Sequence, residues 1–206
     1  MDNIPSCSDK TTDLEKTINS YKQIIEEEPE NAQANYYLGI YSAEQGLHEK
    51  AIEHFKIAIE KNTLSEDSYI NMAKSFLEID ENQLAINCLT KGHKINNDNY
   101  EIVYLLGFAY FLQADYDKAV KFFDSTIKLQ NDYRNAYYFK AIALMRQNKN
   151  SKAIKALNLI LNINPNDHSA LYQKGLIYLN KKERKKAMIL MNKAKEMGNE
   201  DAGLFF

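Results

Sequence analysis

The sequence repeats itself every 34 residues, and no other feature limits its fold so strongly. Small residues recur at this interval at Gly39, Ala73, Gly107, Ala141 and Gly175. A second column consists of alanine, at Ala51, Ala85, Ala119, Ala153 and Ala187. A third column holds bulky apolar residues, at Phe55, Leu89, Phe123, Leu157 and Met191. Three columns that keep one period over five cycles indicate one structural module that is repeated.

Each module contains two apolar segments that are separated by a short polar stretch. In the third module, Tyr104, Phe108 and Phe111 follow the three- and four-residue spacing of a helix, and Gln113-Ala114-Asp115 suits a tight turn. The small columns would let the two helices approach closely. We therefore predict an all-α fold of antiparallel helix pairs. The first helices (A) should begin near residues 32, 66, 100, 134 and 168, and the second helices (B) near 48, 82, 116, 150 and 184.

Residues that cap helices stand where several of these predicted helices begin. Ser65, Asp115 and Asp167 can each accept a hydrogen bond from a free backbone amide, and Thr12 with Glu15 forms a capping box. The segment 12–30 is predicted to form a B helix without an A helix before it, and this helix ends at Pro29. Its apolar stripe consists of Leu14, Ile18, Tyr21, Ile24 and Ile25. Such a helix would cover the first apolar face of the stack.

Composition agrees with a helical fold and limits the classes of partner. Only 7 Gly and 3 Pro occur in 206 residues, which is too few for many tight turns between strands. The net charge of −2 gives no overall attraction to nucleic acid or to anionic lipid. The charge is unevenly spread, since residues 134–206 hold 14 Lys and Arg against 5 Asp and Glu, whereas residues 1–133 hold 12 against 23.

The two cysteines, Cys7 and Cys88, cannot form a disulfide framework, so a reducing cytoplasm is the expected location. Because Cys7 follows Ile4-Pro5-Ser6, an exported or lipid-anchored protein whose signal has been removed is the alternative. No stretch has the length and apolar character of a membrane span.

The residues that could carry catalysis are scattered. The histidines, His48, His54, His93 and His168, are widely spaced, and no two of them stand four residues apart on one helix, as a metal-binding pair would. No glycine-rich phosphate loop occurs. We therefore expect no catalytic site, no cofactor and no metal.

The columns resemble the tetratricopeptide repeat (TPR) family over residues 12–198. Leu38-Gly39, Ala51, Phe55 and Ala58 stand in the spacing of that family. The resemblance implies a right-handed superhelical solenoid of about 11 helices. Its units would lie near residues 32–65, 66–99, 100–133, 134–167 and 168–198, after a flexible N-terminus at 1–11 and a capping helix, and before a C-terminal tail at 199–206. The sequence departs from the family where Asn35 replaces an aromatic residue, and where Lys140 and Lys174 replace a leucine.

A solenoid of this kind lines its concave wall with one face of the A helices. That face predicts a partner-binding groove formed by Tyr36, Tyr37, Ile40, Asn71, Lys74, Tyr104, Leu105, Phe108, Phe111, Tyr138, Phe139, Ile142, Met145, Tyr172 and Leu176. Aromatic residues are enriched at protein interfaces, which favours a groove. The alternative is that neighbouring A helices bury many of these rings against one another.

The sequence thus predicts a non-catalytic scaffold or adaptor that binds a peptide or an amphipathic helix in the groove. A self-assembling structural protein is the alternative, because the last helix would leave Met188, Leu190, Met191 and Met197 uncovered. Either the tail Leu204-Phe205-Phe206 folds back over that face or a second molecule docks there. An anion-binding site at residues 181–186 is less favoured than a solubilising charged surface. An RNA-binding module is also less favoured, since the RNA-binding pentatricopeptide family keeps a period of 35 residues rather than 34.

Overall fold

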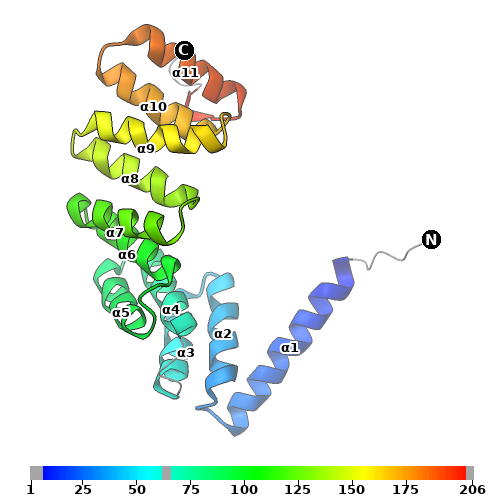
Figure 1. Ribbon diagram of the computed structural model, residues 1–206. Coiled ribbons are helices and arrows are strands. Elements are labelled where there is room, and N and C mark those ends of the chain that lie inside the picture. The colour runs from blue at the N-terminus through cyan, green and yellow to red at the C-terminus, as the bar shows by residue number, and fades with distance from the viewer. Residues whose placement is uncertain (1–6, 62–65, 203–206) are drawn as a thin grey trace. The chain divides into compact units, whose positions relative to one another are not determined.

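The computed structural model describes residues 7–61 and 66–202 and, over those ranges, consists of α-helices joined by short turns (Figure 1). The eleven helices are α1 (Cys7–Glu27), α2 (Ala32–Glu44), α3 (His48–Lys61), α4 (Glu66–Glu78), α5 (Asn82–Ile95), α6 (Tyr100–Leu112), α7 (Tyr116–Leu129), α8 (Arg134–Arg146), α9 (Asn150–Ile163), α10 (His168–Asn180) and α11 (Arg184–Glu196). The predicted all-α repeat architecture is confirmed.

The helices α2 to α11 begin at the ten residues that the 34-residue period predicted. Asp115 and Asp167 cap α7 and α10 as expected, because each carboxylate accepts a hydrogen bond from a backbone amide three residues on. Ser65 and the tail residues 204–206 lie outside the described residues.

The first helix differs from its prediction. It begins at Cys7, so Thr12 lies inside it and does not start it, and residues 7–11 are helical rather than a flexible N-terminus. The physical reason is that no glycine or proline, which would break a helix, lies between Cys7 and Thr12.

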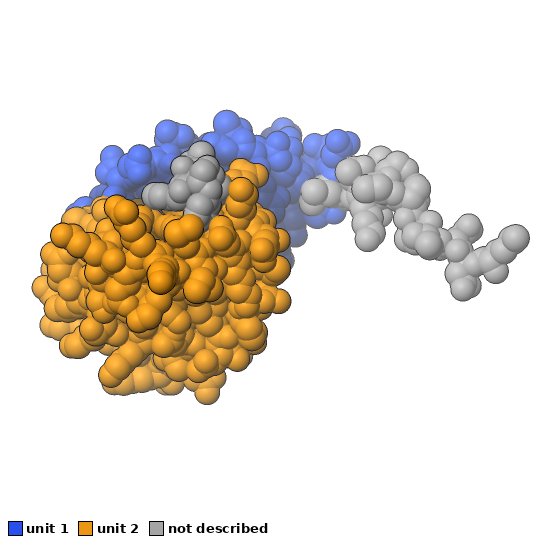
Figure 2. All heavy atoms as spheres, turned by 90° about the horizontal axis from the view of Figure 1, so that it is seen from above, with its two compact units in different colours: residues 1–97 blue, residues 98–206 orange. Residues whose placement is uncertain are grey.

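The chain divides into two compact units, residues 1–97 and residues 98–206 (Figure 2). In both units each A helix packs on the B helix that follows it, and neighbouring A helices contact one another. The charge divides with the units. Unit 1 holds 17 acidic and 9 basic residues, whereas unit 2 holds 11 acidic and 17 basic residues.

The small columns mark the closest approach between the helices of a pair. A Cβ atom added to Gly39 would lie 2.6 Å from the Phe55 ring, and one added to Gly107 would lie 2.9 Å from the Phe123 ring. Both rings are fully buried. Where the bulky column has Leu89 or Leu157 in place of Phe, the small column has alanine in place of glycine. The two columns therefore compensate each other in volume.

Asn35 compensates for the missing aromatic residue of the first repeat. Its buried side-chain amide donates hydrogen bonds to the backbone carbonyls of Pro29 and Asn31, each at 2.9 Å, and its Oδ1 lies 2.9 Å from Nδ1 of His54. At the equivalent place in unit 2, the Tyr137 hydroxyl donates to the carbonyl of Asn131 at 2.9 Å. Both side chains fasten the loop before their helix by hydrogen-bonding its backbone.

The turns within the helix pairs contain a further column that the sequence did not predict. Gly46, Asp80, Ala114, Asn148 and Lys182 stand 34 residues apart, and all have φ between 58° and 73°. Only the first is a glycine, although this left-handed conformation favours glycine. The column shows that the turn geometry is kept even where the residue type opposes it.

The volume compensation predicts the effect of enlarging the small column. Gly107→Ala should destabilise unit 2 by about 1–2 kcal/mol, because overpacking against Phe123 exceeds the gain in helix propensity. Gly175→Ala should change stability much less, since the nearest atom is Cγ of the flexible Met191, at 2.8 Å. Urea unfolding measures both variants. The double variant Gly107→Ala with Phe123→Leu, which copies the Ala–Leu pairs, should recover stability, and a further loss would contradict this account.

Candidate protein-binding surfaces

The structure places most of the predicted groove residues at partly exposed positions. Tyr37 and Lys74 are exposed, Leu105 is buried at 7% exposure, and the other twelve are half-buried. Leu105 therefore belongs to the core and leaves the set of candidate binding residues. The sequence left open whether the rings form a groove or are buried between neighbouring A helices. Each alternative applies in part, since the rings contact one another and still reach the surface.

Five of these rings form one cluster on α6 and α8, here called the aromatic face: Tyr104, Phe108, Phe111, Tyr138 and Phe139. Phe139 lies at its centre. The centroid of its ring is 4.9 Å from that of Phe108, 5.6 Å from that of Phe111 and 5.5 Å from that of Tyr138, in edge-to-face geometry. Edge-to-face pairs of this kind are mutually attractive, so each ring helps to fix its neighbours.

Tyr104 joins the aromatic face to the loop before α8, because its ring lies 5.0 Å from that of Tyr133 and 6.4 Å from that of Phe139. Burial raises the pKa of the Tyr104 phenol well above its ordinary value. Tyr104 is therefore an uncharged member of the aromatic face at neutral pH.

Arg134 connects the aromatic face to α10. Its guanidinium lies 4.9 Å from the centre of the Tyr138 ring, and its Nε and Nη2 donate to the two Asp167 oxygens at 2.8 and 2.9 Å. Asp167 also caps α10 by accepting a hydrogen bond from the Ala170 amide. Burial raises the pKa of Asp167, but these hydrogen bonds outweigh that effect and leave the pKa below its ordinary value. The pair is therefore fully charged at neutral pH and holds Tyr138 in place.

This ion pair predicts an acid-dependent loss of stability in unit 2. Asp167→Asn keeps the cap and should cost about 1 kcal/mol at pH 7, since the 40%-exposed Arg134 side chain is screened by solvent. Asp167→Ala also loses the cap and should cost about 2 kcal/mol. Because the pKa is depressed in the fold, the stabilisation is present above about pH 4 and is lost at lower pH. Urea unfolding at pH 7 and pH 3 measures this, and an equal pH dependence in wild type and Asp167→Asn would contradict it.

The predicted groove residues of unit 1 include polar as well as aromatic side chains. Ile40, Asn71 and Lys74 line a pocket of about 270 Å³ on α2, α3 and α4, together with Glu44, His48 and Glu78 among others. Asn71 Nδ2 lies 3.4 Å from the Tyr36 hydroxyl. Tyr37 faces a second pocket, of about 330 Å³, between α1 and α2, where its ring stacks 4.9 Å from that of Tyr21.

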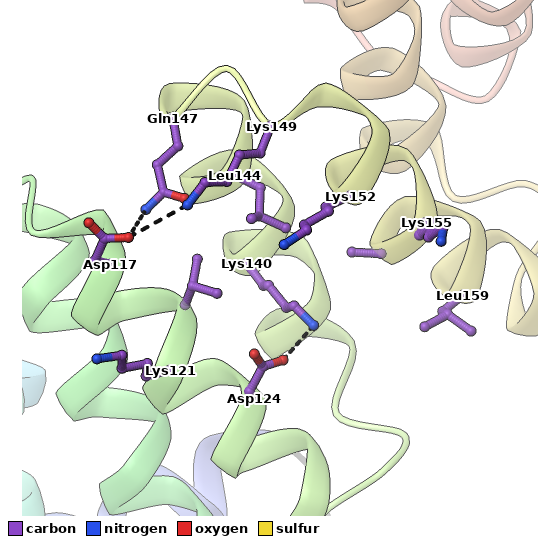
Figure 3. A pocket seen from close by; sticks show the side chains of 12 residues that line it. Asp117, Lys121, Asp124, Lys140, Leu144, Gln147, Lys149, Lys152, Lys155 and Leu159 are labelled. Atoms are coloured by element: carbon purple, nitrogen blue, oxygen red, sulfur yellow. Dashed lines mark hydrogen bonds and ion pairs between the residues drawn. The ribbon is translucent and has the colours of Figure 1, made fainter.

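A third pocket, which the sequence did not predict, opens on α7, α8 and α9 (Figure 3). It has a volume of about 370 Å³, and five lysines line it together with apolar and acidic side chains. Lys140, one of the departures from the family leucine, is among them. That departure was one available signal, and the spacing of Lys149, Lys152 and Lys155 by three residues at the start of α9 was another, whereas only packing brings Lys121 of α7 beside them.

The last helix is less exposed than its sequence indicated. Met191 is 2% exposed beside Gly175, and Leu190 is half-buried, so the expectation that both are uncovered was wrong for Met191. Its place in the bulky column explains the burial. Met188 and Met197 are exposed, at 50% and 40%. Ala202 is fully buried in a cluster with Leu171 and Ala194, so the chain after α11 covers part of this end.

The described side chains offer little for catalysis. Within residues 15–61 and 66–202, no three His, Cys, Asp or Glu side chains gather in a way that could hold a metal ion. The Cys88 thiol is buried and donates to the Tyr69 carbonyl at 3.3 Å, and burial raises its pKa to about 12. It is therefore not an activated nucleophile. None of the described helices combines the length and apolar composition that a membrane span requires.

Comparison with known families identifies the repeat. Family models described as tetratricopeptide repeat match residues 12–65, 111–176 and 168–199. The chain belongs to the tetratricopeptide repeat family. Among curated proteins, none matches the sequence.

Solved structures of TPR proteins share the fold. A crystal structure of MamA is 25% identical, with a TM-score of 0.73 over 80% of this chain and 96% of that one. YrrB, described as a TPR protein with an unusual peptide-binding site, is 18% identical, with a TM-score of 0.72 over 90% of this chain and 96% of that one. A TPR protein from Parabacteroides merdae ATCC 43184 is 16% identical, with a TM-score of 0.67 over 93% of this chain and 75% of that one.

Proposed function

We propose that this TPR protein is a non-catalytic scaffold that holds a segment of another protein on the A-helix side of unit 2. The observation that carries the proposal is the aromatic face, whose five rings are fixed by one another and yet remain partly exposed. Rings that are already ordered lose little conformational entropy when a partner covers them. Aromatic side chains of this kind supply most of the affinity at protein interfaces.

The surroundings of the aromatic face favour a segment with aliphatic anchors. Ile142, Met145, Tyr172 and Leu176 continue the partly exposed apolar surface along α8 and α10. Hydrogen-bonding groups stand at its border, where Gln173 Nε2 donates to the Tyr138 hydroxyl at 3.3 Å. An extended peptide or an amphipathic helix has the required combination of apolar side chains and polar backbone or flanks. The peptide-binding site ascribed to YrrB supports a peptide as a ligand for this fold.

The test is a selection from a displayed library of random peptides with the whole chain as bait. Selected peptides should bind the double variant Phe108→Ala with Tyr138→Ala at least about thirtyfold more weakly than they bind wild type. The reason is that loss of an aromatic hot spot costs about 2 kcal/mol of binding free energy. The control is Leu129→Ala with Ile163→Ala, which removes exposed apolar groups from the ends of α7 and α9.

Both double variants must first retain their helical circular dichroism at the assay temperature. The control should bind the selected peptides within about twofold of wild type, because exposed truncations away from a site change little. If the peptides bind the Phe108 and Tyr138 variant as tightly as wild type, the aromatic face is not the binding surface.

Self-assembly is the second candidate function. The exposure of Met188 and Ile189 on α11, at 50% and 69%, and of Met197 directly after it, at 40%, favours it. An apolar surface of this kind at the end of a repeat array can dock on a second molecule. A mass in solution that rises with protein concentration, and that falls back when Ile189 is replaced by Glu, would support this candidate.

A further inference from the structure

The third pocket, here called the lysine pocket, lies in a repeat that lacks an ion pair found in the repeats before and after it. In α7, Lys118 Nζ lies 2.7 Å from the carboxylate of Asp115, and in α11, Lys186 Nζ lies 2.6 Å from the carboxylate of Glu183. These pairs stand two repeats apart. In the repeat between them, the acidic residue is replaced by Lys149, and the lysine three residues on is Lys152. The substitution replaces a local ion pair by two like charges at the mouth of the pocket.

The charges that line this pocket do not balance. Lys140 Nζ lies 2.5 Å from Asp124, and Lys149 Nζ lies 3.6 Å from Asp117. Three further lysines, Lys121, Lys152 and Lys155, line it with no further acidic residue, so five positive charges meet two negative ones. In Figure 3 the side chains of Lys140 and Lys152 extend into the space between α7 and α9. A pocket with this excess of positive charge attracts an anionic ligand.

The pocket also has an apolar component. Val120, Leu144, Ala156 and Leu159 contribute to its lining, and Leu159 is 46% exposed. Leu144 and Ala156 are already buried, at 3% exposure each, so a ligand that is only a dense anion would leave the half-buried Val120 and the exposed Leu159 uncovered. A ligand with an aliphatic side chain between two carboxylates would cover the apolar groups and meet the lysines.

This combination is specific to one repeat. At the equivalent positions one repeat later, Glu183 replaces Lys149 and Ile189 replaces Lys155. Lys174 there lies 2.7 Å from the Asn158 side-chain oxygen, in place of the Lys140 and Asp124 ion pair. The pocket is therefore not a property that every TPR unit shares.

The pocket and the aromatic face lie on opposite sides of α8. The pocket uses Lys140, Leu144 and Gln147, whereas the aromatic face and its continuation use Tyr138, Ile142 and Met145. Positions two residues apart are rotated by about 200° around the helix axis, so they point to nearly opposite sides. A ligand in the pocket therefore leaves the aromatic face accessible.

We propose that this pocket is a second docking site, which binds an acidic peptide segment of a partner protein with an aliphatic side chain next to its carboxylates. The segment places carboxylates against Lys121, Lys152 and Lys155 and the aliphatic side chain against Val120 and Leu159. Asp117 and Asp124 at the rim repel the closely spaced phosphates of nucleic acid. They admit the sparser charges of a peptide.

The test measures fluorescence anisotropy with a labelled peptide in which glutamate alternates with leucine. The peptide should bind wild type, and the double variant Lys152→Gln with Lys155→Gln should bind it at least about tenfold more weakly. The matched control is Lys128→Gln with Lys195→Gln, which removes the same charge from exposed sites outside the pocket. It should change the affinity less than about twofold. Peptides with Gln in place of Glu, or with Gly in place of Leu, should bind much more weakly.

Several outcomes would overturn the proposal. Equal losses in the two lysine variants would mean that only overall charge matters. A single-stranded RNA that displaces the peptide at lower concentration would assign the pocket to nucleic acid. The mass of the protein in solution could rise with protein concentration in wild type but not in the variant Lys152→Gln with Lys155→Gln. That result would mean that a second copy of this chain occupies the pocket. The Phe108 and Tyr138 variant should bind the acidic peptide like wild type, so failure here is distinct from failure of the proposed function.

Discussion

The close crossing of the two helices in each pair is the constraint on which the rest of the structure depends. Gly39 against Phe55 and Gly107 against Phe123 leave no room for a methyl group between helix and ring. Glycine weakens an isolated helix, so packing rather than helix propensity must account for its place there. The crossing sets the distance between the helices of a pair. It thereby sets which side chains of α6 and α8 remain at the surface.

Positions outside the crossing are free to differ between repeats, and the binding surfaces arise there. The same α8 carries Tyr138 and Phe139 toward the aromatic face and Lys140 toward the lysine pocket. Unit 1 has the same helix pairing, yet it presents Asn71 and Lys74 in a pocket with mixed polar and apolar lining. A single packing rule thus supports surfaces of different chemistry.

The sequence predicted the repeat, the helix starts and the capping aspartates because each depends on local periodicity. It could not separate Tyr104 from Leu105, since α6 is apolar around its whole circumference and only packing decides which side is buried. The left-handed turn residues escaped prediction because Ala114 and Lys182 have no preference for that conformation. The lysine pocket escaped it because its charges meet only when α7, α8 and α9 are packed.

The central claim is that partners bind on the A-helix side of unit 2. Hydrogen exchange, followed by mass spectrometry with and without a saturating library-selected peptide, tests it most directly. The account predicts slower exchange in α6, α8 and α10, with α7, α9 and α11 unchanged. Protection confined to the B helices α7, α9 and α11, or spread evenly over the unit, would contradict it.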